Sequence, residues 1–180
     1  MNNKNTVELT FPDGLKRPFQ TGVSGMEIAK SISKSLSKEA VAIEVNGVEL
    51  DLCDKIIKDS NINILTINSE KGLEIMRHTL TAQVLAKAVK NIYPNSKLAI
   101  GPTIENGFYY DFLFEKPISE EDFPKIEKEM KKIISSGASI KKILRSKEDA
   151  ISLFEKRNEN YKVDIIKNAG QENDLSLIHI

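Results

Sequence analysis

Few side chains in this sequence could take part directly in acid-base or nucleophilic chemistry. The 180 residues contain two histidines, His78 and His179, and one cysteine, Cys53. An imidazole exchanges protons near neutral pH without any shift of its pKa, so His78 is a candidate for a base or for a group that positions a water molecule. The two histidines and the cysteine are too widely separated to form a structural zinc site, and we expect no bound metal.

A long helix over residues 72–92 is expected to carry His78. Apolar side chains recur at intervals of three and four from Ile75 to Ile92, which places them on one helical face together with His78. The segments that follow are interpreted as strands and helices from their periodicity and from serine caps. The expected strands are residues 97–100, 108–114, 139–144 and 161–166, and the expected helices are residues 119–135 and 146–157. The tail, residues 175–180, is interpreted as part of an element whose partner is missing.

The first third of the chain has the pattern of a small mixed sheet. Asn46-Gly47 between apolar runs favours a type I′ hairpin turn, and Ser24 followed by Glu27 predicts a capping box for a helix over residues 24–37. Strands are expected at residues 7–11, 16–19, 40–45, 48–50 and 61–67. Five strands around one helix indicate a β-grasp-like arrangement.

The composition fits a globular protein with two small α+β domains, residues 1–68 and 69–180. Hydrophobic residues make up 40% and charged residues 29% of the sequence, and 26 basic residues balance 26 acidic ones. A net charge of zero argues against a protein that binds nucleic acid by charge alone, although a local basic face is still possible. The lone cysteine, the absence of a signal peptide and the lack of a spanning apolar stretch lead us to expect a cytoplasmic protein with no membrane partner.

Several motifs resemble one known family. Residues 9–14, Leu-Thr-Phe-Pro-Asp-Gly, are similar to the opening of the ubiquitin-like TGS domain. Residues 72–79 and 99–111, with Tyr161-Lys162-Val163 further on, closely resemble the editing domain of the threonyl-tRNA synthetases. The resemblance covers nearly the whole chain in the order of that family. It implies a TGS domain over residues 1–68 and an editing-type domain over residues 69–180 that is truncated at its C-terminal end.

This resemblance implies a function. The family attaches threonine to its tRNA in a catalytic domain that lies outside this chain, so ATP, magnesium and zinc are expected to belong there and no cofactor here. The editing domain hydrolyses wrongly made seryl-tRNA, because one methyl group is worth only ~1–3 kcal/mol of discrimination in a pocket. The implied partners are the 3′ end of tRNA and, in trans, the remainder of the synthetase.

The sequence departs from the family pattern at the catalytic groups. The family has two histidines four residues apart on the long helix and a later Cys-Arg-Gly-Pro-His motif, which is absent here. After His78 an extra residue is present, and Gln83 stands in place of the second histidine. In an α-helix Ala82 shares the face of His78, whereas Gln83 points about 140° away. A π-bulge could absorb the extra residue, but an amide is no base near neutral pH. We therefore expect impaired hydrolysis.

The resemblance assigns roles to five residues, and each has an ordinary alternative. His78 could bind the tRNA end or position a water, or be a helix histidine with a backbone partner. Lys162 could contact the ester region of the substrate, or be a solvated lysine. Gly101 could allow a nucleotide to approach the backbone, or serve a turn. Tyr109 or Tyr110 could stack on the terminal adenine, and alternation in a strand would send only one of them to a pocket.

Two other functions remain open. The chain could be a non-catalytic module that binds tRNA or another synthetase subunit, or the product of a decaying split gene without activity.

Overall fold

The computed structural model describes residues 5–137, 140–168 and 174–179. It divides into two units, Met1–Met76 and Arg77–Ile180, each with its own apolar core. The division falls inside helix α3 (Glu70–Thr79), later than the boundary expected after residue 68. The first turn of α3 belongs with the first unit because Lys71 forms ion pairs with Glu44 and Glu49 of that unit.

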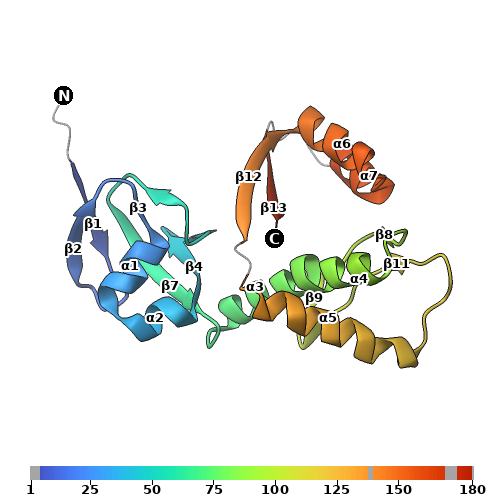
Figure 1. The fold of residues 1–180 in the computed structure, drawn as a ribbon. Coiled ribbons are helices and arrows are strands. Elements are labelled where there is room, and N and C mark those ends of the chain that lie inside the picture. Colours follow the sequence, from blue (N-terminus) through green and yellow to red (C-terminus); the bar gives the residue numbers. More distant parts are fainter. Residues whose placement is uncertain (1–4, 138–139, 169–173, 180) are drawn as a thin grey trace. The chain divides into compact units, whose positions relative to one another are not determined.

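A five-stranded mixed sheet forms the first unit (Figure 1). The strands lie in the order β2 (Lys16–Gln20), β1 (Thr6–Thr10), β7 (Ser60–Thr66), β4 (Ala40–Val45) and β5 (Val48–Leu50). The β1–β7 pair is parallel, and the other three pairs are antiparallel. Two short strands, β3 (Val23–Ser24) and β6 (Lys55–Ile56), pair separately. The expected mixed sheet of a β-grasp fold is confirmed.

Local signals account for the connections in this sheet. Asn46 and Gly47 both have positive φ, 50° and 83°, as a type I′ turn requires, so the predicted hairpin is confirmed. The capping box is also confirmed: Glu27 N donates to Ser24 Oγ at 3.3 Å, and Ser24 N donates to Glu27 Oε2 at 2.8 Å.

The single helix expected over residues 24–37 is instead two helices, α1 (Gly25–Ile32) and α2 (Lys34–Glu39). Ser33 lies between them in an extended conformation, and its hydroxyl accepts a hydrogen bond from Leu36 N at 3.0 Å. A serine that can cap a new helix therefore ends one and begins the next. On α1, Ile28 packs against Val7, Leu9 and Ile43 in the core of the unit.

The long helix of the second unit contains a π-helical segment. It comprises α3, the π-helix η1 (Leu80–Leu85) and α4 (Ala86–Ile92). Ala86 N donates to Thr81 O across five residues, which is the spacing of a π-helix. A π-helical segment is thus present at the position where a π-bulge had been considered. Apolar side chains of η1 and α4 pack against helix α5 (Phe123–Ser135), which follows the short 3-10 helix η2 (Glu120–Asp122).

The strands between Lys97 and Leu113 are shorter than expected. The continuous strand expected at residues 108–114 is wrong, because two separate pairs form there. In these pairs β9 (Thr103–Ile104) lies beside β10 (Gly107–Phe108), and β8 (Lys97–Leu98) lies beside β11 (Phe112–Leu113). Strand β12 (Lys141–Ser146) pairs antiparallel with β13 (Asp174–His179), so the C-terminal segment does have a partner.

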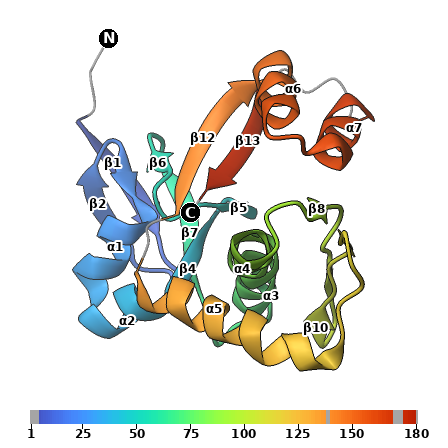
Figure 2. The ribbon, with the colours of Figure 1, turned by 45° about the vertical axis from the view of Figure 1, so that its right-hand side comes forward.

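The strand expected at residues 161–166 is a helix instead. Helices α6 (Lys147–Lys156) and α7 (Asn160–Asn168) pack side by side (Figures 1 and 2). Val163 and Ile166, three residues apart, are buried with Phe154 of α6, whereas Tyr161 and Ile165 are exposed. The alternation of apolar residues from Tyr161 to Ile165 suggested a strand, but two of these three side chains do not enter the core. Within the described residues, none of the helices is both long and apolar enough to cross a membrane.

Candidate functional site

Lys162 is partly buried on the first turns of α7. Its Nζ lies 5.2 Å from the centroid of the Phe154 ring, close enough for a cation–π contact. Burial lowers the pKa of the Lys162 ammonium; the Glu159 carboxylate acts in the opposite direction, and the cations Arg157 and Lys90 lower it further. Lys162 is therefore no solvated surface lysine. A cation held in a desolvated position interacts strongly with any anionic oxygen that reaches it.

Glu159 is the charged group that connects Lys162 to the long helix. Its side chain is buried, and Oε1 lies 3.0 Å from Lys90 Nζ of α4. Oε2 accepts a hydrogen bond from Leu98 N at 3.5 Å, and the backbone carbonyl accepts one from Lys162 N at 3.0 Å. No sequence motif pointed to Glu159. A buried carboxylate three residues before a candidate lysine can be recognised only once the helix of that lysine is placed.

Tyr110 lies within the electrostatic reach of Glu159. Its ring stacks on Phe112 with the centroids 4.5 Å apart, and the planes are 21° from parallel. Burial raises the pKa of the Tyr110 hydroxyl, and the negative charge of Glu159 raises it further. Lys162 and Tyr110, two of the residues singled out from the sequence, thus share one charged neighbour.

Close packing, and not a turn, explains why residue 101 is a glycine. A Cβ at this position would lie 2.1 Å from Tyr110 Cδ2 and 2.8 Å from Thr81 Cγ2. Both distances are far below van der Waals contact, so a glycine is needed for the Tyr110 ring to approach the backbone. Gly101 therefore belongs to the surroundings of Tyr110.

The two adjacent tyrosines face different environments. Tyr109 is 53% exposed, and its backbone N donates to Pro102 O at 3.3 Å. Tyr110 is the partly buried member of the pair. The expectation that at most one of them lines an interior site agrees with this exposure, although neither residue lies in a regular strand. The exposed Tyr109 ring is free to stack on a base from solution.

His78 stands apart from this group. Its side chain is exposed on α3, and it makes no hydrogen bond or ion pair with any residue that the structure describes. Three residues later Thr81 is fully buried, and its hydroxyl donates to Arg77 O at 2.7 Å. Gln83, inside η1, is partly buried. Because residues five apart align in a π-helix, Gln83 lies closer to the face of His78 than it would in an α-helix.

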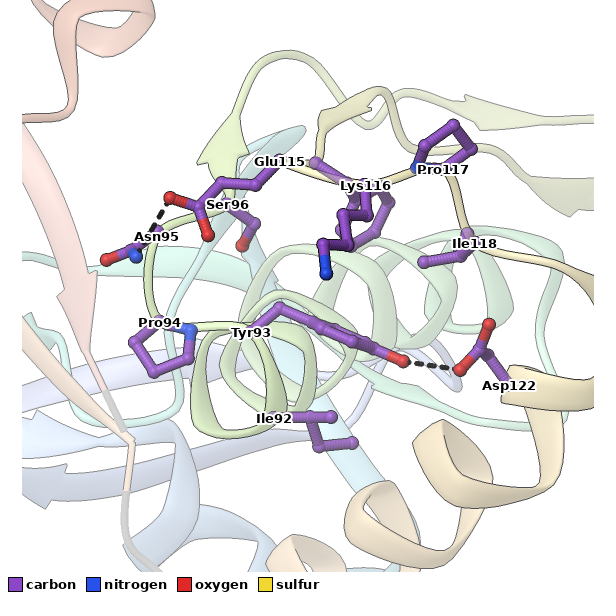
Figure 3. A pocket seen from close by; sticks show the side chains of 11 residues that line it. Ile92, Tyr93, Pro94, Asn95, Ser96, Glu115, Lys116, Pro117, Ile118 and Asp122 are labelled. Atoms are coloured by element: carbon purple, nitrogen blue, oxygen red, sulfur yellow. Dashed lines mark hydrogen bonds between the residues drawn. The ribbon is translucent and has the colours of Figure 1, made fainter.

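A separate pocket of about 370 Å³ lies at the end of α4 (Figure 3). Residues 92–96 and 114–118 line it together with Asp122, and none of the five candidate site residues does. Inside it, the Tyr93 hydroxyl donates to Asp122 Oδ1 at 2.8 Å, and Asn95 Nδ2 donates to Glu115 Oε1 at 3.0 Å. These two pairs satisfy four of the polar residues in the lining, whereas the buried Ser96 hydroxyl has no hydrogen-bond partner among the described residues. We assign no ligand to this pocket.

One group of potential metal ligands lies in the first unit. The ligand atoms of Asp51, Asp54 and the exposed Cys53 lie within 4.8 Å of one another, which the sequence analysis did not anticipate. Asp51 N donates to Asp54 Oδ2 at 3.0 Å, and Asp54 N donates to Asp51 O at 3.0 Å. The aspartates thus close a turn, and this structural role explains their proximity.

Comparison with known proteins first identifies the family of the first unit. Residues 7–66, which span the five-stranded sheet, match the family described as the TGS domain. The chain as a whole is also similar to curated proteins named threonine--tRNA ligase. It is 46% identical to the one from Allorhizobium ampelinum over 97% of this chain and 26% of that relative, and 46% identical to the one from Acetivibrio thermocellus over 94% and 27%. The relative from Francisella philomiragia is 45% identical over 95% and 27%.

The chain therefore contains a TGS domain and, over nearly its whole length, is similar to the N-terminal part of the threonine--tRNA ligases. It spans about a quarter of the length of the relatives that it matches.

Proposed function

We propose that the second unit binds the aminoacylated 3′ end of tRNA as the editing region of a threonine--tRNA ligase. The observation that carries this proposal is the partly buried Lys162 ammonium on α7, whose pKa burial lowers, together with the Tyr110 ring that packs against Gly101. A desolvated ammonium is suited to an ester or phosphate oxygen, and the exposed Tyr109 ring offers a stacking surface for the terminal adenine.

Hydrolysis of seryl-tRNA by this chain is proposed to be slow. A water molecule that attacks the ester must lose a proton, and His78 is the residue near η1 that can accept one at neutral pH. Gln83 stands in the segment where a second imidazole would act with it, and a side-chain amide cannot accept that proton.

Deacylation requires only water and these side chains, so we propose that this chain needs no cofactor for it. We also place the protein in the cytoplasm, where charged tRNA is found.

The direct test is binding of a stable analogue of the charged tRNA end. In 3′-seryl-amino-3′-deoxyadenosine an amide replaces the labile ester, and its binding can be followed by NMR and calorimetry. Lys162→Met is expected to weaken binding at least tenfold. The matched control is Lys167→Met, since Lys167 is exposed on the same helix and pairs with Glu155 at 3.7 Å. This control should bind within twofold of the original protein. Absence of binding by the original protein would refute the proposal.

A second experiment addresses the chemistry. Gln83→His is expected to raise the rate of seryl-tRNA deacylation at least tenfold, since a positioned general base typically contributes ~10²–10⁴. Gln83→Ala is the control, because it changes the same position without supplying a base. A high deacylation rate in the original protein would show that the site is already complete.

The alternative function is non-catalytic binding of tRNA or of another part of a synthetase. The replacement of the second imidazole by Gln83 favours it. Tight analogue binding by the original protein, combined with no hydrolysis by the Gln83→His variant, would select this alternative.

A further inference from the structure

The second unit contains two separate apolar clusters. Buried side chains of η1, α4 and α5 form the first cluster, and α6 and α7 form the second, around Phe154 and Val163. Lys162 belongs to the helix pair of the second cluster, whereas Gly101 and Tyr110 follow α4 in the chain. The position of Lys162 relative to Tyr110 therefore depends on the contacts that join the two clusters.

Polar contacts near the start of α7 make this connection. The Lys90 ammonium lies 3.0 Å from Glu159 Oε1 and also donates to Ser96 O at 3.0 Å. Leu98 N donates to Glu159 Oε2 at 3.5 Å, and Lys97 Nζ donates to Asn158 O at 2.8 Å. Glu159 takes part in two of these contacts, and its side chain is 7% exposed, against 30% for Lys90.

Glu159 is also tied to Lys162 through the backbone. Its carbonyl oxygen accepts hydrogen bonds from Lys162 N at 3.0 Å and from Val163 N at 3.1 Å, which are the first bonds of α7. A shift of Glu159 must therefore move the first turn of the helix that carries Lys162. A buried carboxylate without its cation would be strongly disfavoured, so the Lys90–Glu159 pair resists separation.

We propose that Glu159 is a positioning residue: its carboxylate fastens the Lys162-bearing helix to Lys90 and Leu98 and so fixes the position of the Lys162 ammonium relative to α4 and β8. This inference rests on the proposed function for the role of Lys162 itself. The negative charge of Glu159 also raises the pKa of the partly buried Lys162 ammonium, whereas burial and the nearby cations Arg157 and Lys90 lower it.

The test separates the position of Lys162 from ligand binding. Reductive ¹³C-methylation gives an NMR signal for Lys162 whose pH titration is measured in the full chain without tRNA. Glu159→Gln keeps the shape of the side chain and removes its charge, so the Lys162 titration is expected to move to lower pH. Glu159→Ala also removes the hydrogen bonds, and the amides of α7 are expected to exchange with deuterium at least tenfold faster. The matched control is Glu155→Gln on neighbouring α6, where the exposed Glu155 lies 3.7 Å from Lys167. It should leave both measurements unchanged.

Binding of the seryl-amide analogue completes the test. Glu159→Gln is expected to weaken it at least fivefold, with Glu155→Gln within twofold of the original protein. An unchanged Lys162 titration in Glu159→Gln together with unchanged exchange in Glu159→Ala would overturn the positioning role. If both change as expected and the original protein binds no analogue, the positioning role holds and the proposed function of the unit fails.

Discussion

The two units of this chain differ in how regularly they are built. The first unit has one apolar core and a five-stranded sheet with strands of up to seven residues. The second has two apolar clusters, two strand pairs of only two residues each beside the longer β12–β13 pair, and a π-helical segment in its longest helix. It also buries the Glu159 carboxylate and much of the Lys162 side chain. Buried charges and π-helices are costly, and both are frequent at functional sites.

This difference indicates a division of roles between the units. In the first unit nearly every local signal serves the fold, from the capping box at Ser24 to the turn at Asn46. In the second unit the packing is less regular, and charged and aromatic side chains occupy buried or partly buried positions. Substitutions in the first unit should therefore change stability alone, whereas those around Glu159 and Tyr110 should change stability and binding together.

The largest effect is expected from Leu9→Ala in the first unit. Leu9 is fully buried, and its truncation leaves a cavity, so the unit should lose about 3 kcal/mol of unfolding free energy. The readouts are separable, because the chain has no tryptophan and its four tyrosines, Tyr93, Tyr109, Tyr110 and Tyr161, all lie in the second unit. Urea unfolding followed by circular dichroism should shift, while the tyrosine fluorescence transition stays in place. Parallel shifts of both signals would show that the two units unfold together, which would contradict the view that they respond separately to substitution.

The next effect is expected from Gly101→Ala in the second unit. A Cβ 2.1 Å from the Tyr110 ring must displace the ring or the backbone, at a cost of about 2 kcal/mol. The tyrosine fluorescence transition should move to lower urea, and binding of the seryl-amide analogue should weaken. Gly107→Ala is the control, because no atom lies within 4 Å of its Cβ position and its φ is not positive. If the Gly101→Ala protein were as stable as the Gly107→Ala protein, the packing role assigned to Gly101 would be wrong.

The same contrast explains which features the sequence could predict. The Asn46-Gly47 turn and the Ser24 capping box depend on neighbouring residues, and both are present. The extra residue after His78 indicated the π-helix, because an insertion in a helix otherwise rotates everything beyond it. These features needed no knowledge of tertiary contacts.

The errors lie where a distant partner decides the conformation. Tyr161 to Ile166 alternates like a strand, yet contact with α6 selects the helix that buries Val163 and Ile166. Residues 108–114 are aromatic-rich, and pairing with two different short strands divides them. Lys162 was found by resemblance, whereas Glu159 was missed, because its role depends on Lys90, which is 69 positions earlier in the sequence.

A smaller effect, on pH dependence, is expected for Lys162. Its pKa in the folded protein is lowered, chiefly by burial, so the folded state disfavours the charged ammonium. The second unit should therefore gain stability as the pH rises from that lowered pKa toward the ordinary value of 10.5. The useful window ends near pH 10, where ionisation of Tyr110, whose pKa is raised from 10.0, begins to oppose folding. Lys162→Met should flatten the rise in tyrosine-detected unfolding free energy across this window, and Lys167→Met should keep it.

The smallest effect is expected for Glu27 in the first unit, where folding favours the charged form, whereas at Lys162 it favours the neutral form. Hydrogen bonds from the Ser24 hydroxyl and backbone, then the nearby Lys55, lower the pKa of Glu27 from 4.5 to about 2. A lowered carboxyl pKa contributes stability that is present above pH 4.5 and is lost as the pH falls toward about 2. Because Glu27 is exposed, water and salt screen much of this contribution. Glu27→Gln should reduce the acid sensitivity of the α1 amide signals, measured by NMR during urea unfolding at pH 6 and pH 3. Glu127→Gln in the second unit serves as the control and should leave these signals unchanged. Equal acid sensitivity with and without Glu27 would mean that the capping box fixes the helix start by shape alone, and the first unit would then draw no stability from that charge.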